Sequence, residues 1–319
     1  MMTDFPKAKG LRVTAVASRS PERARAAAEK YSIPHAFGSY EELAECPDVD
    51  LVYVAVPHHR HMECAKLCME HKKHVLCEKP MALNDMQVRH MREVAAKNGV
   101  FLMEAMWTRF FPLSEKLREL VSSGAIGDVR LITSNFAGRS TYRPQVKDRI
   151  FDPEQGGGAL LDLGVYNLSA ASMLLGNEPV EVSSFVTKAE TGVDGTETIQ
   201  LLYENGAMAQ LFSSVEFSGN STQCIFGTEG RITIPDFWHP TRMEVVSYRD
   251  GCTVQYAFPA ENEGFYHEFL HVRDCILRGL SESPIMPLAE TEQIHAIMTR
   301  LRREWGVFYP GEEDFVAEA

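Results

Sequence analysis

Residues 51–56 read LVYVAV, and this run of apolar positions is the strongest constraint on how the chain folds. A strand that meets water on one face alternates apolar and polar residues, whereas a strand of a parallel sheet is buried on both faces. Such a sheet needs covering helices, and the neighbouring sequence supplies them. We predict strands at residues 11–17, 35–37, 74–77 and 100–103, and helices at residues 21–31, 62–71 and 85–98, with a short helix capped by Ser39. The first third of the chain is therefore predicted to form a doubly wound α/β sheet.

From residue 107 onward the pattern changes to short strands separated by turns. Glu204-Asn205-Gly206 and Asp250-Gly251 are hairpin signals. Strands are predicted at residues 129–137, 180–188, 197–203, 208–216, 222–227, 231–234, 243–248 and 253–258, and helices at 113–122, 159–175, 265–278 and 289–304. We predict two domains, a dinucleotide-binding domain at residues 1–106 and an α+β domain with a large, mostly antiparallel open sheet at residues 107–319.

Composition limits the partners and the location that we expect. Asp and Glu number 44 against 32 Lys and Arg, for a formal net charge of −12. A protein that neutralises phosphates needs a basic face, so no nucleic-acid partner is expected. The apolar stretch at residues 159–175 is interrupted by Asp162, Asn167 and Ser169, so we expect no membrane span. Seven scattered cysteines predict reduced thiols and a cytoplasmic protein.

Two short motifs follow predicted strands, at the sheet edge where open α/β sheets bind ligands. In Cys77-Glu78-Lys79-Pro80, the proline forces a turn, with a cis bond as one option, that would aim Lys79 into the cleft. Lys79 could stabilise an alkoxide or lower the pKa of a neighbouring acid, and a solvated surface lysine is the alternative. In the second motif, Ser18 and Arg19 suit the 2′-phosphate of NADP, and a helix cap followed by a solvated arginine is the alternative.

We predict no metal site. His58-His59-Arg60-His61 with Cys64 contains suitable ligand types, but adjacent histidines cannot all face one ion. Cys64 and Cys68 are one helical turn apart, which is typical of one helix face.

The most unusual segment is residues 156–166, GGGALLDLGVY. Asp162 and Tyr166 are four residues apart, so on a helix they share one face. Burying an acid and a phenol among apolar residues is costly unless they have a partner or a task. The residues alone leave two explanations open, a reactive pair and a hydrogen-bonded structural pair. They also leave cofactor binding open, because the sequence lacks the G-x-G-x-x-G motif of dinucleotide-binding sheets.

Taken together, these stretches resemble the glucose–fructose oxidoreductase/inositol dehydrogenase/rhizopine catabolism family, abbreviated Gfo/Idh/MocA. Within it they are most similar to the branch of trans-1,2-dihydrobenzene-1,2-diol dehydrogenases, which also act as NADP-dependent D-xylose 1-dehydrogenases. The segments that carry the resemblance are residues 15–20 (AVASRS), 38–43 (GSYEEL), 50–57 (DLVYVAVP), 73–80 (KHVLCEKP), 101–112 (FLMEAMWTRFFP), 156–166 (GGGALLDLGVY) and 283–291 (SPIMPLAET). The EKP motif marks the broad family, and the segments at 101–112 and 156–166 are more specific to the branch.

The resemblance implies a Rossmann-type fold, an NADP cofactor and a catalytic role for three residues. Tyr166 would be the general acid/base, Lys79 would lower the pKa of its phenol, and Asp162 would orient the site. The residues implied to bind the cofactor are Ser18, Arg19, Pro57, His58, His61, Glu78, Lys79, Trp107 and Arg109. Those implied to form an apolar wall for a ring-shaped substrate are Trp107, Phe136 and Trp238. A homodimer is implied as well, formed through the open face of the second domain's sheet.

The chain departs from the family at its start. Family members open with a strand and a glycine loop before the segment that residues 11–20 match. That first strand normally lies between two others in the middle of the sheet, so both neighbours would be left unpaired without it. We expect that the chain is an incomplete version of a longer protein; a divergent protein that binds NADP poorly is the alternative. An in-frame upstream extension encoding the glycine motif would distinguish the two.

The function expected from the resemblance is NADP-dependent oxidation of a cyclic trans-diol or of D-xylose, a small-molecule substrate. One alternative is a related sugar or inositol dehydrogenase. The other is a non-catalytic, dimeric binding protein that has lost the phosphate-binding loop.

Overall fold

The computed structural model describes residues 4–140, 148–259 and 263–312, which form two compact units. Unit 1 consists of Met1–Ala82, Gln87–Trp107 and Asn262–Leu288, and unit 2 of Leu83–Met86, Thr108–Glu261 and Ala289–Ala319. This division differs from the predicted domains because Asn262–Leu288 joins the first unit. Helix α7 (Tyr266–Leu277) packs there through Phe269, which stacks on Phe5 at 4.6 Å and meets Tyr53 edge-on at 5.5 Å between ring centroids.

Unit 1 alternates strands and helices, as the sequence predicts. Its elements, apart from α7, are β1 (Ala15–Ala17), α1 (Pro21–Tyr31), β2 (His35–Phe37), α2 (Tyr40–Glu45), β3 (Leu51–Val54), α3 (His61–Glu70), β4 (His74–Glu78), α4 (Asp85–Asn98) and β5 (Leu102–Ala105). The predicted caps of α1 and α2 are confirmed, since the hydroxyl groups of Ser20 and Ser39 accept hydrogen bonds from the amides of Arg23 and Glu42.

The parallel sheet of unit 1 is in two parts. β1 pairs with β2, while β3, β4 and β5 form a separate parallel sheet in that order. β1 is shorter than predicted because it pairs over only three residues. A cavity of about 870 Å³ is lined by β1 and β3 together, with Phe269 of α7 also at its wall. Within the described residues, the edges of β1 and β3 that face this cavity lack a strand partner, which confirms the expected interruption of the sheet.

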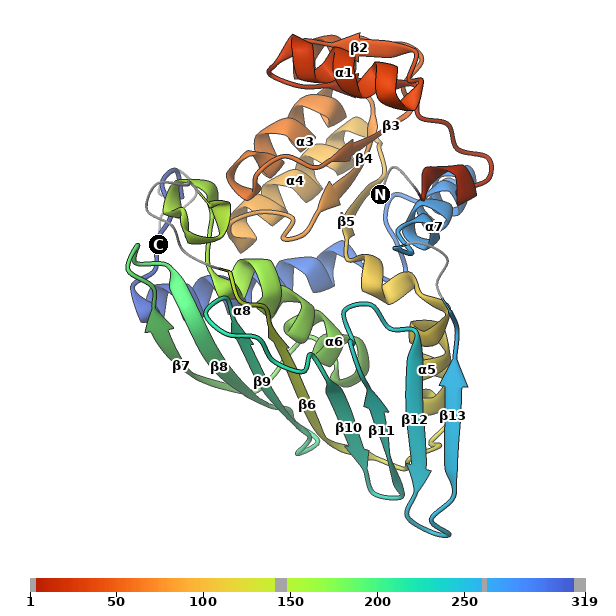
Figure 1. Cartoon of the computed structure of the whole chain (residues 1–319), viewed down its shortest axis with the longest axis vertical. Coiled ribbons are helices and arrows are strands. Elements are labelled where there is room, and N and C mark those ends of the chain that lie inside the picture. Colours follow the sequence, from red (N-terminus) through yellow and green to blue (C-terminus); the bar gives the residue numbers. More distant parts are fainter. Residues whose placement is uncertain (1–3, 141–147, 260–262, 313–319) are drawn as a thin grey trace. The chain divides into compact units, whose positions relative to one another are not determined.

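Unit 2 is built on one continuous eight-stranded sheet in the order β13-β12-β11-β10-β6-β9-β8-β7 (Figure 1). Only β6 and β9 are parallel, and the other neighbours are antiparallel. Its strands are β6 (Val129–Ala137), β7 (Glu181–Lys188), β8 (Asp194–Leu202), β9 (Met208–Ser214), β10 (Gln223–Gly227), β11 (Gly230–Ile234), β12 (Arg242–Ser247) and β13 (Thr253–Ala257); its helices are α5 (Pro112–Ser122), α6 (Val165–Leu175) and nearly all of α8 (Leu288–Trp305). The mostly antiparallel open sheet predicted from the sequence is therefore confirmed.

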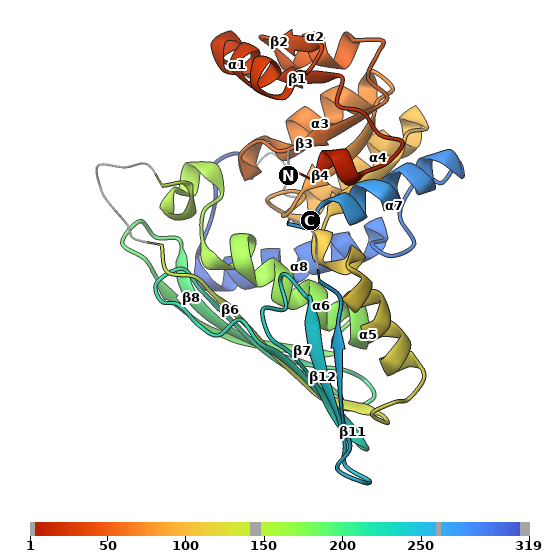
Figure 2. The ribbon, with the colours of Figure 1, turned by 45° about the vertical axis from the view of Figure 1, so that its right-hand side comes forward.

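The helices of unit 2 lie on one face of this sheet, as Figure 2 shows for α5 and α6. Asn167 joins α6 to the sheet: its side chain accepts a hydrogen bond from the Ser134 hydroxyl at 2.6 Å and donates to the Ser213 hydroxyl at 3.0 Å. The opposite face carries exposed apolar side chains, including Phe185, which is 81% exposed.

The predicted helix at residues 159–175 begins with a π-helical turn, Leu160–Gly164, and continues as α6. One stretch, Pro153–Leu175, is long and apolar enough to cross a membrane, and 78% of its most apolar window is buried inside the protein. A core helix has the same length and composition, so this stretch is weak evidence for a membrane span.

Candidate active site

Apart from Ser18 and Arg19, the predicted cofactor-binding residues of unit 1 gather at one edge of the β3-β4-β5 sheet. Pro57 and His58 follow β3, Glu78 ends β4 with Lys79 directly after it, and Trp107 follows β5. Because these strands are parallel neighbours, their carboxyl ends lie at the same edge. Doubly wound sheets bind their ligands at this edge.

The end of β4 is held by a network around Glu78. Its carboxylate accepts hydrogen bonds from the Tyr53 hydroxyl and, at 3.1 Å, from the Lys79 amide. Burial raises the pKa of Glu78 above its usual value, against the lowering effect of the Tyr53 hydrogen bond and the Lys79 charge. The Lys79-Pro80 bond is cis, which is the option that the sequence left open, and Lys79 is partly buried.

His61 connects the loops after β3 and β4. Its Nδ1 lies 2.8 Å from the Pro80 carbonyl oxygen, and its Nε2 lies 2.8 Å from that of Val56. Burial lowers the pKa of His61 to about 4, so the neutral ring donates one of these two bonds at neutral pH. His58 is buried beside it, with ring centroids 5.7 Å apart. The structure thus gives His61 a role in joining two loops of the predicted cofactor edge.

Ser18 and Arg19 lie directly after β1 and before the capped start of α1. The Ser18 hydroxyl accepts a hydrogen bond from the Ser20 amide at 3.2 Å, and Arg19 is exposed. These two residues therefore sit at a strand end, where the sequence analysis expects a 2′-phosphate, and their role stays a prediction.

In unit 2, aromatic side chains lie beside the predicted acid/base, Tyr166. Tyr166 is only 8% exposed, and the Phe136 ring meets it edge-on at 5.3 Å between centroids. Trp238 stacks on Phe136 at 5.6 Å with an interplanar angle of 8°. The structure thus brings three of the predicted site residues together. The fourth aromatic residue, Trp107, belongs to unit 1 and stacks on Phe265 at 4.4 Å.

Asp162 is buried and pairs with Arg149, a residue that the sequence analysis missed. Both terminal guanidinium nitrogens of Arg149 donate to Asp162 Oδ1 at 3.0 Å. Arg149 lies thirteen residues earlier in the chain and is 48% exposed, so no spacing or patterning signal marks it. This contact gives the buried carboxylate a charged partner.

Arg109, another predicted cofactor residue, lies in a buried network. Its guanidinium donates to the Ser169 hydroxyl at 2.8 Å and to the Glu290 carboxylate at 2.6 Å. Burial raises the pKa of Glu290, but the hydrogen bond and charge of Arg109 outweigh it and hold the pKa below its usual value. The described contacts of Arg109 are thus structural, and its contact with a cofactor stays a prediction.

Two buried acids that the sequence analysis missed lie under the π-helical turn. Asp194 Oδ2 accepts a hydrogen bond from the Leu160 amide at 2.6 Å. A Cβ on Gly158 would lie 2.2 Å from Asp194 Oδ1, and one on Gly164 would lie 2.9 Å from Glu197 Oε1. Burial raises the pKa of Asp194 to about 6, and burial together with the Asp194 charge raises that of Glu197 well above its usual value. These acids therefore fix the start of the segment that carries Asp162 and Tyr166.

Comparison with known protein families identifies both parts of the chain. Residues 2–106 match the model described as "Oxidoreductase family, NAD-binding Rossmann fold", and residues 114–233 match the "GFO/IDH/MocA C-terminal domain". The chain belongs to the Gfo/Idh/MocA oxidoreductase family. Its Rossmann-type parallel sheet and its large, mostly antiparallel sheet are those of this family, as the sequence analysis predicts.

Curated relatives and solved structures place this Gfo/Idh/MocA chain more closely. It is 42% identical to a trans-1,2-dihydrobenzene-1,2-diol dehydrogenase of Xenopus laevis, over 93% of the chain and 91% of the relative, and 36% identical to the human protein of that name, over 94% and 91%. The structure is similar to an aldose-aldose oxidoreductase from Caulobacter crescentus solved with glycerol, with a TM-score of 0.86, 27% identity and 96% and 92% of the two chains covered. It is also similar to a 3-ketoreductase from Actinomadura kijaniata solved with NADP, with a TM-score of 0.83, 25% identity and 95% and 92% coverage.

The family implies a nicotinamide cofactor, and the residues present fit part of it. The carboxyl edge of β3 and β4 presents Pro57, His58 and Lys79, which suits the nicotinamide end, and Ser18 and Arg19 at the end of β1 suit the adenosine ribose. The glycine motif that usually binds the pyrophosphate is not in this sequence. The described residues therefore offer candidates for the two ends of the cofactor and none with the usual glycine motif for the pyrophosphate.

Proposed function

We propose that this chain is an NADP-dependent dehydrogenase that oxidises a hydroxyl group of a cyclic trans-diol or of an aldose such as D-xylose. The observation that carries the proposal is the similarity to dihydrodiol dehydrogenases, which spans 93% of the chain at 42% identity. The neighbour from Caulobacter is named an aldose-aldose oxidoreductase, and this name supports a sugar as the second substrate class.

The proposed chemistry assigns one task to each of three side chains. Tyr166 accepts the proton of the substrate hydroxyl, and the positive charge of Lys79 favours the phenolate that accepts it. Asp162, held by Arg149 at 3.0 Å, orients the substrate. A bound nicotinamide would supply the acceptor for the hydride of the carbinol carbon.

The aromatic residues of unit 2 support a ring-shaped substrate. Phe136 and Trp238 stack nearly parallel, and Phe136 meets the Tyr166 phenol edge-on. Flat aromatic faces provide a large apolar contact for a cyclohexadiene or pyranose ring. In this proposal they position the ring whose hydroxyl Tyr166 deprotonates, and Trp107 adds to the same wall.

The test is the initial rate of NADPH formation with D-xylose and with trans-1,2-dihydrobenzene-1,2-diol. We expect Tyr166→Phe and Lys79→Met each to lower kcat by about 10²- to 10⁴-fold, the range for loss of a general acid/base. Tyr203→Phe is the matched control, since Tyr203 is another buried tyrosine of unit 2, and it should keep the rate. Equal rates for wild type, Tyr166→Phe and Lys79→Met would refute the assigned roles.

Two further measurements separate this proposal from its alternatives. Faster turnover of inositol or another sugar across a substrate panel would indicate a related sugar or inositol dehydrogenase. Calorimetry with NADP addresses the non-catalytic alternative, because a folded chain that releases no heat when NADP is added would favour a protein that has lost cofactor binding. Comparison of NADP with NAD in wild type and Arg19→Asp tests whether Ser18 and Arg19 read the 2′-phosphate.

We also propose a homodimer formed through the open face of the unit 2 sheet. Phe212 and Leu131 lie on that face, since the next residues along their strands, Leu211 and Ile132, are buried on the opposite one. Phe185 lies there too, because it pairs with Thr198, which in turn pairs with Phe212. Met208 on the same face is 48% exposed. An apolar surface of this kind is typical of an interface.

Light scattering coupled to size-exclusion chromatography measures the assembly directly. We expect wild type to elute as a dimer and Phe185→Asp as a monomer, because the new charge would be buried in the interface. Phe308→Asp is the control, since Phe308 is an exposed aromatic residue (62%) elsewhere in unit 2. A dimer that survives Phe185→Asp would place the interface elsewhere.

A cytoplasmic location is the last part of the proposal. All seven cysteines are free, and five of them are buried. Reduced thiols in this number are typical of a compartment that keeps cysteines reduced. Imaging of the tagged chain checks the location.

A further inference from the structure

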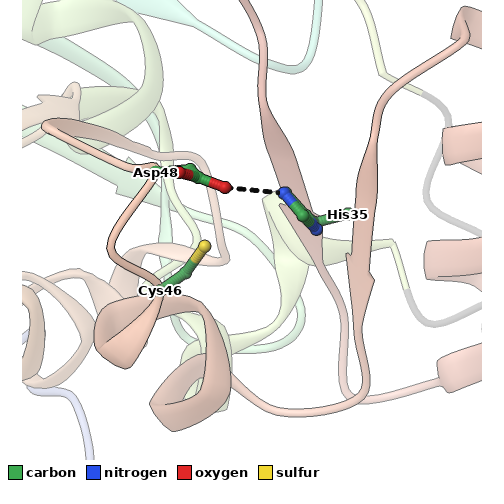
Figure 3. A group of neighbouring side chains, drawn as sticks. All are labelled: His35, Cys46 and Asp48. Atoms are coloured by element: carbon green, nitrogen blue, oxygen red, sulfur yellow. Dashed lines mark hydrogen bonds and ion pairs between the residues drawn. The ribbon is translucent and has the colours of Figure 1, made fainter.

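Three side chains of metal-binding types meet in unit 1, away from the residues assigned to the reaction. They are His35 at the start of β2, Cys46 directly after α2, and Asp48 in the loop that leads to β3. Figure 3 shows the imidazole, the thiol and the carboxylate pointing toward one another. One ligand atom from each lies within 4.8 Å of the other two, and His35 Nε2 is 3.1 Å from Asp48 Oδ2.

The loop that carries Cys46 and Asp48 is held by hydrogen bonds of its backbone to neighbouring residues. The Cys46 amide donates to the Leu43 carbonyl at 3.1 Å, and the Cys46 carbonyl accepts from the Lys73 ammonium group at 2.8 Å. The Asp48 carbonyl accepts from the Thr14 hydroxyl at 3.1 Å. The backbone of the group is thus held in place by contacts that need no ion.

The third side chain is fixed by the neighbouring strand. The His35 amide donates to the Thr14 carbonyl at 3.1 Å, where β2 begins its pairing with β1. Thr14 therefore touches both sides of the group, through its carbonyl on the His35 side and through its hydroxyl on the Asp48 side. A preformed arrangement of this kind reduces the entropy that binding an ion must overcome.

The donor set selects among metals. Imidazole nitrogen, thiolate sulfur and carboxylate oxygen are the three ligand types that zinc takes in proteins. Calcium and magnesium prefer oxygen alone, so the thiolate disfavours both. Three protein ligands leave one tetrahedral position for water, and the exposed sides of His35 (40%) and Asp48 (62%) give solvent access to that position.

We propose that His35, Cys46 and Asp48 bind one Zn²⁺ ion, with water as the fourth ligand. The sequence analysis predicts no metal site, and only the folded chain brings these residues together. On binding, the Cys46 thiol loses its proton to solvent, and His35 Nε2 exchanges its hydrogen bond to Asp48 for the metal. The ion would join β2 to the loop before β3, and so would link the two parts of the interrupted parallel sheet.

The inference is independent of the proposed dehydrogenase function, because none of the three residues belongs to the proposed reaction. The test therefore reads metal binding and not turnover. The full chain, freed of metal by a chelator, is titrated with Co²⁺ alone, which reports thiolate coordination through a charge-transfer absorption band. The metal-loaded chain is then titrated with Zn²⁺, and bound zinc is measured by elemental analysis.

We expect one equivalent of Co²⁺ to produce the charge-transfer band. Zn²⁺ should then displace the Co²⁺ and remove the band. Cys46→Ser should abolish the band, whereas Cys252→Ser, which removes an exposed thiol of unit 2, should keep it. Asp48→Asn should weaken binding by about tenfold or more, and because that side chain is 62% exposed, this variant covers the case in which Cys46→Ser does not fold. No band in wild type, an unchanged band in Cys46→Ser, or unchanged affinity in Asp48→Asn would overturn the site.

Discussion

In unit 1, β3 is apolar at all four positions, yet three of its residues are partly exposed, whereas β8 in unit 2 alternates between buried and exposed residues along most of its length. β4, the neighbour of β3, has three fully buried positions. The difference lies in the strand partners: among the residues that the structure describes, β3 pairs with β4 alone, while β8 pairs with β7 and β9 on its two sides. Thus β3, whose sequence is typical of burial on both faces, lines a cavity. By contrast β8, whose sequence is typical of one solvent-exposed face, is paired on both edges.

This contrast shows that hydrophobic pattern and sheet completeness are separate properties. The pattern of β3 predicts a strand of a parallel sheet buried on both faces, whereas among the described residues β3 is the edge strand of the β3-β4-β5 sheet and lines the cavity of about 870 Å³. In unit 2 the pattern and the pairing agree. Buried and exposed residues alternate along β8, and the eight strands pair without interruption from β13 to β7. We therefore expect unit 1 to be the less stable of the two.

The largest expected effect is a difference in amide hydrogen exchange between the two sheets. Amides of β1 and β3 should exchange about a hundredfold or more faster than those of β6 and β9, because open edges allow local unfolding at low free energy. Exchange followed by NMR resolves single residues. It should show alternate amides of β3 protected, namely those that face β4. Equal protection in β3 and β9 would contradict the contrast between the sheets.

The next effect concerns the π-helical turn of unit 2. Gly158 has φ of +120°, and a Cβ there would lie 2.2 Å from Asp194 Oδ1. Gly158→Ala should therefore lower the free energy of unfolding of unit 2 by about 2–4 kcal/mol, through backbone strain and a steric clash. Gly138→Ala is the matched control because no atom lies within 4 Å of its added Cβ, and it should stay within about 0.5 kcal/mol of wild type.

Urea unfolding followed by amide hydrogen exchange measures the free energy of unfolding of both variants. The exchange is measured separately in peptides from each unit. The loss in Gly158→Ala should appear in unit 2 peptides and leave β3 and β4 unchanged. A loss shared equally by both units would mean that they unfold as one, which would remove the basis for comparing their stabilities.

The sequence predicts most local structure because its signals are local. Ser20 and Ser39 precede their helices and cap them, and the two hairpin turns follow from glycine at fixed positions. The interruption of the parallel sheet between β1 and β3 is also predicted, because the order of strands in such sheets is regular.

Contacts between distant segments are what the sequence does not predict. Asp194 contacts Leu160 only because β8 lies beneath the π-helical turn, and Arg149 reaches Asp162 from a separate segment. The same holds for His35 and Asp48, whose approach depends on the pairing of β2 with β1. No spacing rule marks these pairs, so the candidate site is predicted in its motifs and missed in the residues that support them.

The smallest expected effect is a difference in how two buried groups respond to pH. The folded-state pKa of Asp194 in unit 2 is raised from 3.8 to about 6, so the folded chain holds that proton more tightly, and its contribution to stability falls as pH rises from about 4 to 6. The folded-state pKa of His61 in unit 1 is lowered from 6.5 to about 4, so the unfolded chain binds the proton more tightly. Its contribution to stability therefore rises with pH across a similar window.

Each contribution is isolated by comparing a variant with wild type, because burial also raises the pKa of Glu78 and Glu268 in unit 1. Asp194→Asn should make the slope of unit 2 stability against pH less negative, and His61→Asn should make that of unit 1 less positive or more negative. Each change is at most about 1.4 kcal/mol per pH unit for one proton. Urea unfolding between pH 4 and 6.5, read by unit, measures both slopes. If both variants changed the slope of stability against pH in the same direction, the opposite effects of burial on Asp194 and His61 would be refuted.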